Sequence, residues 1–136
     1  MNSKTVVNMM LGGGQMTEKL NSFFKTYGLS VQQYHILRVL QVQAFKPLNL
    51  YMLQEYMIHK SSNITRLVEK LRKKELIERK PCENNRRKVE VVITHKGLGL
   101  LDGIEEALIA YEKKLIANLN HAEQAQLNSL LEKLNQ

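Results

Sequence analysis

Residues 60–97 read KSSNITRLVEKLRKKELIERKPCENNRRKVEVVITHKG, and this stretch decides the fold. A helical pattern with a polar outer stripe passes into an alternating, strand-like pattern that encloses a basic turn. Between positions 60 and 90 there are eleven Lys or Arg residues and five Glu residues, so this stretch carries +6 of the chain's net charge of +7. The positive charge is therefore local, as expected for a surface that neutralises phosphates rather than for a general solubility bias.

The composition indicates one domain in a reducing compartment. The chain has 136 residues, which is enough for one ordinary domain with a real core but short for two. Cys82 is the single cysteine, so no disulfide within the chain can form. The apolar run near the N-terminus is interrupted by Asn8 and is too short for a signal peptide or a membrane span. We therefore expect a cytoplasmic protein without a membrane segment.

The first helical pattern, over residues 6–27, contains an unusual interruption. Gly12, Gly13 and Gly14 are consecutive, and each would cost about 1 kcal/mol relative to Ala in a helix interior. We expect the helix to break or kink there, or a neighbouring backbone to approach closely.

Capping signals separate the helices that follow. Ser30 with Gln33 forms a capping box, and Asn49 can cap a short helix over residues 50–57. A longer amphipathic helix is predicted from Ser61. Its apolar residues follow the i, i+3, i+4, i+7 spacing: Ile64, Leu67, Val68 and Leu71.

After residue 77 the apolar period changes from helical to alternating. Residues 78–81 and 88–94 predict two strands. Residues 83–86 predict the turn between them, in which Asn84 and Asn85 can accept a positive φ. The sequence thus predicts a β-hairpin with a basic tip.

Two further helical patterns follow the hairpin. Thr94 can cap a long helix, and Asn120 with Glu123 forms a capping box for a final one. Both helices carry more apolar side chains than a small core beside them could cover. We expect a second copy of the chain to cover them.

The helix predicted from Ser61 presents a short outer face rich in hydrogen-bond donors. At about 100° per residue, the side chains opposite the apolar face are Ser62, Asn63, Arg66, Lys70 and Lys73. Asn can pair bidentately with adenine and Arg with guanine in the major groove, while Ser and Thr reach bases or phosphates. The alternative is a solvated helix face. The preceding short helix and tight turn make a helix-turn-helix, which favours DNA reading.

The predicted hairpin tip carries Arg86, Arg87 and Lys88. Such a tip suits the minor groove, where negative potential is focused and the weakly hydrated guanidinium can enter. The alternative is again that these cations are simply exposed to solvent and contact no DNA. Three adjacent cations on a projecting loop repel one another unless an anion lies between them. This repulsion favours contact with the phosphates of DNA.

Residues 29–101 resemble the MarR family of bacterial regulators. The resemblance lies in LSVQQYHILRVL, in SSNITRLVEKLRKKELIERK and in NNRRKVEVVITHKGLGLL, which is similar to the family's wing signature of Asp-Arg-Arg, an alternating strand and Thr-x-x-Gly. It implies a mainly α fold, a winged helix-turn-helix with a two-stranded β-hairpin wing and with N- and C-terminal dimerisation helices. The chain would then be a single domain. Its parts would be residues 1–28 and 94–136, the dimerisation helices, and residues 29–93, the winged helix-turn-helix.

The resemblance also implies a homodimer that binds double-stranded DNA at an inverted-repeat operator. By position it assigns contacts to the recognition helix and to the wing: Ser61, Ser62, Asn63, Thr65 and Arg66 in the helix, and Arg86 and Arg87 in the wing. From the outer face and the tip we add Lys70 and Lys88. This chain departs from the family at Asn85, where an acidic residue often steadies the wing through an ion pair, and in its glycine triplet.

Many members of that family release DNA when a small aromatic or phenolic acid enters a crevice between the dimer helices and the winged domain. Residues that could line such a crevice here are Phe23, Phe24, Tyr27, Tyr34, His35 and Arg38. We take Phe23, Tyr27, Tyr34 and Arg38 as the candidates for binding an aromatic carboxylate effector, with Arg38 meeting the carboxylate. The alternative is that the aromatic residues are simply core.

Other kinds of chemistry find little support in the sequence. It has no phosphate-binding glycine loop, nucleophile elbow or paired carboxylates beside a histidine, so we expect no enzyme. The four histidines are scattered, so we expect no metal site and no cofactor. We predict a sequence-specific DNA-binding transcriptional regulator, a repressor. The competing interpretation is a winged-helix module for protein contact or ligand binding without specific DNA binding.

Overall fold

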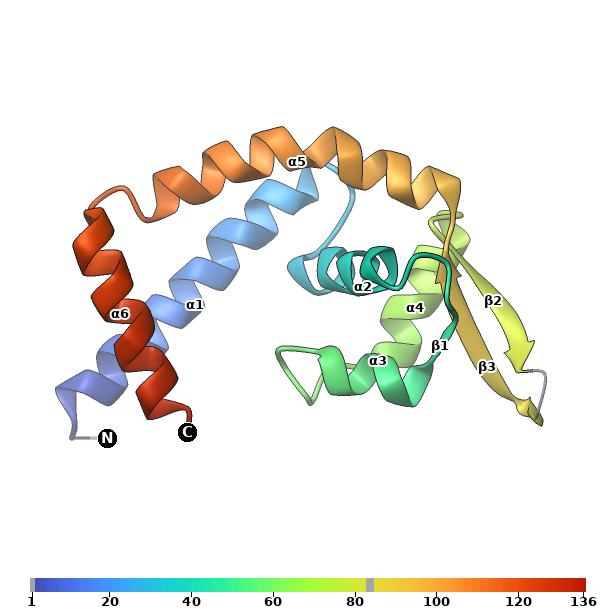
Figure 1. Cartoon of the computed structure of the whole chain (residues 1–136), viewed down its shortest axis with the longest axis horizontal. Helices are drawn as coiled ribbons and strands as arrows, with labels where there is room; N and C mark the ends of the chain where they lie inside the picture. The colour runs from blue at the N-terminus through green and yellow to red at the C-terminus, as the bar shows by residue number, and fades with distance from the viewer. Residues whose placement is uncertain (1, 83–84) are drawn as a thin grey trace. The chain divides into compact units, whose positions relative to one another are not determined.

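The computed structural model describes residues 2–82 and 85–136, apart from the side chains of residues 82–88. The chain divides into two compact units, Met1–Gly103 and Ile104–Gln136. Figure 1 shows the order of the elements along the chain. The first unit contains α1 (Lys4–Lys25), α2 (Val31–Val42), β1 (Leu48–Asn49), α3 (Leu50–Tyr56), α4 (Ile64–Lys73), β2 (Ile77–Cys82) and β3 (Asn85–Ile93). Helix α5 (His95–Leu115) begins in the first unit and ends in the second, which also contains α6 (His121–Leu134).

Helix α1 runs without interruption through Gly12, Gly13 and Gly14. The predicted break is therefore wrong. Outside the adjacent backbone of α1 itself, a Cβ built on any of the three glycines would meet no described atom within 4 Å, so the predicted close approach is also absent from the described residues. The hydrogen-bonded turns on both sides of the triplet sustain the helix, because extending a helix is far easier than nucleating one.

The capping signals are confirmed where they were predicted. Ser30 and Gln33 form a reciprocal capping box at the start of α2, and the Asn49 side chain accepts the backbone N–H of Met52 at the start of α3. Helix α4, however, begins at Ile64 rather than Ser61. The reason is that Asn63 caps it, its Oδ1 accepting the backbone N–H of Arg66 at 3.2 Å.

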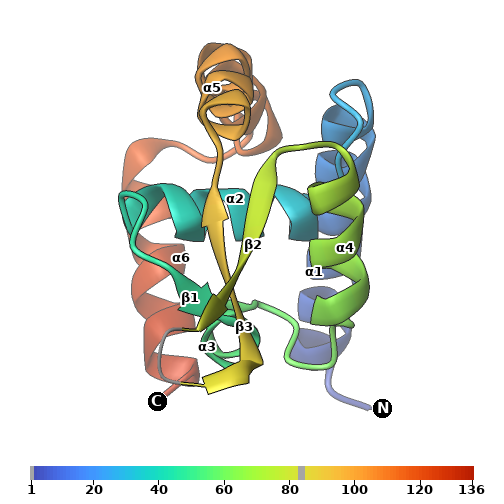
Figure 2. The ribbon, with the colours of Figure 1, turned by 90° about the vertical axis from the view of Figure 1, so that its right-hand side faces the viewer.

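The hairpin belongs to a three-stranded antiparallel sheet of order β1-β3-β2 (Figure 2). We call the hairpin of β2 and β3 the wing. Strand β3 begins at Asn85, three residues before the predicted start, so the predicted turn is wrong for the backbone of Asn85 and Arg86. The rest of that turn, Glu83 and Asn84, lies outside the described residues. Strand β1 was not predicted, since two residues are too few to show an alternating pattern.

The inner face of α4 packs into the core of the winged domain. Val68 and Leu71 are buried, as predicted from their spacing. The same core contains Ile36 and Leu37 of α2, Leu53 of α3, Ile77 of β2, and Val91 and Ile93 of β3. The mainly α winged helix-turn-helix expected from the sequence is thereby confirmed, and α4 is held with its other face outward.

The junction between β3 and α5 explains the Thr-x-x-Gly motif. The Thr94 hydroxyl accepts the backbone N–H of Gly97 at 3.0 Å and donates to the carbonyl of Glu75 at 2.7 Å. Thr94 therefore caps α5, as predicted. A Cβ on Gly97 would lie 2.4 Å from the backbone oxygen of Leu76, so only glycine fits where α5 passes the start of β2.

In the second unit, Asn120 and Glu123 form the predicted capping box of α6. This helix buries none of its residues. Four leucines are exposed along it: Leu127, Leu130, Leu131 and Leu134. No helix in the described part of the chain is both long and apolar enough to cross a membrane.

Candidate nucleic-acid interface

The outer face of α4 is polar and exposed. Thr65, Arg66, Lys70 and Lys73 are exposed, opposite the buried Val68 and Leu71. The Arg66 side chain stands one helical turn before Lys70 on this face, so a guanidinium and an ammonium project from the same side. The structure thus brings together three of the predicted contact residues: Thr65, Arg66 and Lys70.

The residues just before α4 are placed differently from the prediction. Ser61 and Asn63 are exposed but lie outside the helix, and Asn63 Oδ1 is already an acceptor in the cap. The Ser62 hydroxyl was expected on the outer face; instead its oxygen is buried, with no hydrogen-bond partner among the described residues. The helix start at Ile64 causes both differences, because helical periodicity does not extend to Ser61, Ser62 and Asn63.

An open hollow of about 400 Å³ lies between the start of α2 and the outer face of α4. Its polar lining residues are Ser30, which caps α2, Gln32 and Gln33 of α2, and Asn63, Arg66 and Lys70. Gln32 is a candidate contact residue that the sequence did not single out. It lies two residues after Ser30, the capping residue of α2, but nothing in its spacing indicates that this helix start lies beside α4.

An ion-pair network joins α4 to the first wing strand. The Glu69 carboxylate accepts hydrogen bonds from Arg72 Nε at 3.0 Å and NH2 at 2.6 Å, and from Arg79 NH1 at 3.0 Å. The hydrogen bonds from Arg72, with the added charge of Arg79, lower the pKa of Glu69 to about 2. The carboxylate is therefore ionised at any pH at which the protein would work.

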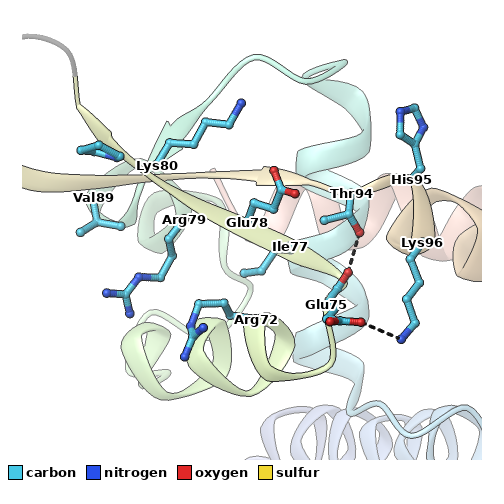
Figure 3. A pocket seen from close by; sticks show the side chains of 11 residues that line it. Arg72, Glu75, Ile77, Glu78, Arg79, Lys80, Val89, Thr94, His95 and Lys96 are labelled. Carbon is cyan, nitrogen blue, oxygen red and sulfur yellow. Dashed lines mark hydrogen bonds and ion pairs between the residues drawn. The ribbon is translucent and has the colours of Figure 1, made fainter.

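The wing predictions can be placed only by their backbone. Arg86, Arg87 and Lys88 lie in β3, but their side chains are outside the described residues. On β2, Arg79 and Lys80 are exposed. Figure 3 shows the guanidinium groups of Arg72 and Arg79 reaching to one side of β2 and the Lys80 ammonium reaching to the other. These residues line an open hollow of about 1000 Å³ beside the wing, together with Glu75, Glu78 and the first residues of α5.

Two of the three aromatic effector candidates pack directly on a core residue, Phe24, and the third packs on one of those two. The Phe23 ring packs edge-on against Phe24, with centroids 5.2 Å apart, and lies 5.5 Å from the Tyr27 ring. The Tyr34 ring stacks on Phe24 at 4.4 Å. Because Phe24 is buried, this arrangement favours the core interpretation. Arg38 is exposed and donates to the side chain of Gln41.

A more enclosed cavity of about 240 Å³ lies elsewhere, between α1, the start of α2 and the segment after α3. Of the crevice candidates only His35 lines it, and its Nε2 is 2.7 Å from the carbonyl oxygen of Tyr56. The other lining residues are Gly13, Met16, Thr17, Leu20, Val31, Gln32, Met57, Ile58 and His59. Phe23, Tyr27, Tyr34 and Arg38 are not among them.

Comparison with known proteins identifies the family. Residues 29–89 match the model of the MarR family. The chain is 28% identical over 119 residues to the HTH-type transcriptional regulator MhqR of Bacillus subtilis (strain 168), an alignment that covers 88% of this chain and 81% of MhqR. Residues 29–89 carry the MarR-family domain, and the chain is similar to MarR-family transcriptional regulators. The predicted resemblance is confirmed, and so is the expectation that the chain is a regulator and not an enzyme.

Solved structures of MarR proteins share the fold over nearly the whole chain. The MarR transcription factor from Planctomyces limnophilus is 26% identical with a TM-score of 0.78, and the match covers 97% of this chain and 96% of that one. A cysteine mutant of MarR from E. coli, solved in complex with operator DNA, is 22% identical with a TM-score of 0.77, and the match covers 93% and 89% of the two chains.

Helix α4 was predicted from the sequence, but two features of its surroundings were not. Gln32 and the Glu69–Arg79 pair join segments that are distant along the chain. No pattern in the sequence predicts the position of Gln32 beside α4 or the Glu69–Arg79 ion pair. The spacing of residues along one element carries no information about which element lies beside it.

Proposed function

We propose that this protein represses transcription in the cytoplasm by binding double-stranded DNA as a homodimer at an inverted-repeat operator. The observation that carries the proposal is the exposed, donor-rich face of α4, from which Arg66 and Lys70 project next to the start of α2. A helix fits the major groove, and an Arg side chain can pair bidentately with guanine there. The local excess of positive charge supplies the attraction to phosphates.

The apolar surfaces of α1 and α6 support a dimer. Helix α6 buries no residue, and in α1 the side chains of Val6, Met9, Met10 and Leu11 are exposed. Surfaces of this kind are costly to leave in water and are typical of an interface between copies. Two-fold symmetry would place two α4 helices about 34 Å apart, one turn of DNA, which is the reason for expecting an inverted repeat. A dimer seated on a promoter would block polymerase.

Selection of bound duplexes from random DNA tests this function. The expected result is an inverted repeat, bound by the wild-type protein much more tightly than random duplex. Arg66→Ala should lose about 1–3 kcal/mol of that discrimination, whereas Lys46→Ala, an exposed cation between α2 and β1, should lose none. Failure to enrich any sequence, with weak binding equal on all duplexes, would favour the protein-contact or ligand-binding module.

We also infer that the cavity beside His35 binds a small aromatic acid that releases the operator. Its volume of about 240 Å³ is below the roughly 300–1,000 Å³ typical of sites for larger ligands, which suits a single ring. Met16, Leu20 and Met57 offer apolar walls, and Gln32, His35 and His59 offer polar groups. The cavity touches the segment that leads into the cap of α4, so a ligand that prefers a shifted segment would weaken DNA binding.

Glycine substitutions provide a matched test of the cavity. Outside the adjacent backbone of α1, a Cβ at either Gly12 or Gly13 meets no described atom within 4 Å, but of the two only Gly13 lines the cavity. Gly13→Leu should therefore fill the cavity and abolish the response of operator binding to benzoate and hydroxybenzoates, while Gly12→Leu retains it. Equal responses in both variants would contradict this effector site.

A further inference from the structure

We propose that Glu69 is a positioning residue, which ties recognition helix α4 to strand β2 through Arg79 and so sets the direction of the wing relative to the DNA-reading face. This inference rests on the proposed DNA-binding function. It adds a residue that touches no DNA and yet determines how helix and wing engage DNA together.

The geometry distinguishes this network from an ordinary ion pair along a helix. Arg72 is three residues after Glu69 on the same helix, and such a pair stabilises only the helix itself. Arg79 is ten residues away on a different element, and its NH1 shares Glu69 Oε2 with Arg72 Nε. One carboxylate therefore holds two guanidinium groups, and the charged donors give both contacts a defined direction.

The position of Arg79 along β2 makes the contact effective. Strand β2 leaves the core at Ile77, which is buried, and Arg79 lies two residues further toward the tip. Strand β1 already pairs with β3 on one edge of the wing, and the Glu69–Arg79 contact holds the other edge, β2, against α4. A wing held on both edges can swing less than a wing held on one. Cys82 lies five residues beyond Ile77, roughly 17 Å along a strand, so a swing of about 10° would move the end of β2 by roughly 3 Å.

Strand pairing transmits this constraint to the rest of the wing. Arg79 is paired with Val91, and Val91 also pairs with Leu48 of β1. The direction of β2 is thus shared with β3, which carries the backbone of Arg86 and Arg87. A displacement of a few ångströms exceeds the tolerance of a hydrogen bond to phosphate, so removal of the Glu69 carboxylate should weaken wing contacts made far from Glu69.

A competing role for Glu69 predicts that removing its carboxylate changes DNA affinity in the opposite direction. If Arg79 were itself the phosphate contact, Glu69 would occupy a guanidinium that DNA needs. Removing the carboxylate would then release Arg79 and tighten binding. If Glu69 positions the wing, removing its carboxylate weakens binding even though the protein loses a negative charge.

The test measures operator affinity and its salt dependence for Glu69→Gln, Arg79→Ala and the double variant, with circular dichroism to verify folding. Each single variant should lose roughly three- to thirtyfold in affinity, and the double variant should lose no more than either one, because both remove the same ion pair. The log-log salt slope of Glu69→Gln should flatten by about 0.9 for each phosphate that the wing no longer reaches.

Lys80→Ala is the matched control, since Lys80 is the neighbouring cation on β2 and reaches to the other side of the strand (Figure 3). It should lose less affinity than Arg79→Ala. Equal losses would assign Arg79 to general charge attraction, and tighter or unchanged binding by Glu69→Gln would overturn the positioning role. If operator selection succeeds and Arg66→Ala weakens discrimination while Glu69→Gln has no effect, only the inference fails. If no sequence is selected at all, the proposed function fails first.

Discussion

The ring of Phe24 stacks on the ring of Tyr34, with centroids 4.4 Å apart and planes 20° from parallel. This contact joins the end of α1 to the first turns of α2. The effector candidates Phe23 and Tyr34 both pack on the buried Phe24, and Tyr27 packs on Phe23. The aromatic cluster therefore has a structural task that needs no ligand.

Phe24→Ala should lower the free energy of unfolding by about 3–5 kcal/mol, because it removes a fully buried ring. Tyr34→Ala should cost less, since Tyr34 is only half-buried. Chemical denaturation measures both. Neither variant should abolish an effector response that depends on the cavity beside His35, and selective loss of that response in a folded Tyr34→Ala protein would restore Tyr34 as an effector residue.

Asn63 should act through the cap of α4. Asn63→Ala should lower stability by about 0.5–2 kcal/mol, whereas Asn63→Ser retains a capping oxygen and should be nearly neutral. Thermal unfolding separates the two variants. If Asn63→Ser keeps full stability but loses discrimination between operator and random DNA, the Asn63 amide also contacts a base.

Gly97→Ala should destabilise the protein by about 1–3 kcal/mol, because the added methyl group would lie 2.4 Å from the carbonyl oxygen of Leu76. Gly99→Ala is the control on the same helix. A Cβ there meets nothing within 4 Å, so the substitution should be neutral or stabilising by up to about 1 kcal/mol. Equal melting temperatures for the two variants would show that α5 can move away from Leu76.

The Glu69 carboxyl should titrate with a pKa of about 2, which carbon NMR of its side chain can follow. A carboxyl whose pKa is lowered on folding stabilises the protein above its unfolded value near 4.5, and that contribution is lost as the pH falls toward 2. Arg72→Ala should raise the pKa more than Arg79→Ala, because Arg72 supplies the largest contribution. A wild-type pKa near 4.5 would show that the network does not persist in solution.

Replacing Arg86 and Arg87 together by Ala should weaken binding to every duplex and flatten the log-log salt slope by about 0.9 for each phosphate that is no longer neutralised. The backbone of β3 should be unaffected, since alanine at either position keeps the backbone N–H and C=O groups of the strand. Affinity and slope are read from one salt series on operator and on random DNA. An unchanged slope would mean that the wing arginines do not reach phosphates.

Short-range chemistry made several features predictable from the sequence. The capping boxes of Ser30 with Gln33 and of Asn120 with Glu123 are satisfied within four residues of chain, and the buried stripe of α4 follows from helical period alone. The wing strands were recognised from alternation, although β3 starts earlier than predicted because a strand can extend by pairing even where its side chains do not alternate.

Contacts between elements depended on the tertiary structure. Strand β1 exists only because Leu48 and Asn49 meet Val91 and Glu90 of β3. The pairing of Glu69 with Arg79, the hollow beside Gln32 and the cavity beside His35 each join segments that the sequence leaves unrelated. The physical reason is one of range: caps and periodicity are decided by neighbours a few residues away, whereas the partner of an exposed charge or the wall of a cavity is decided by packing of the whole domain.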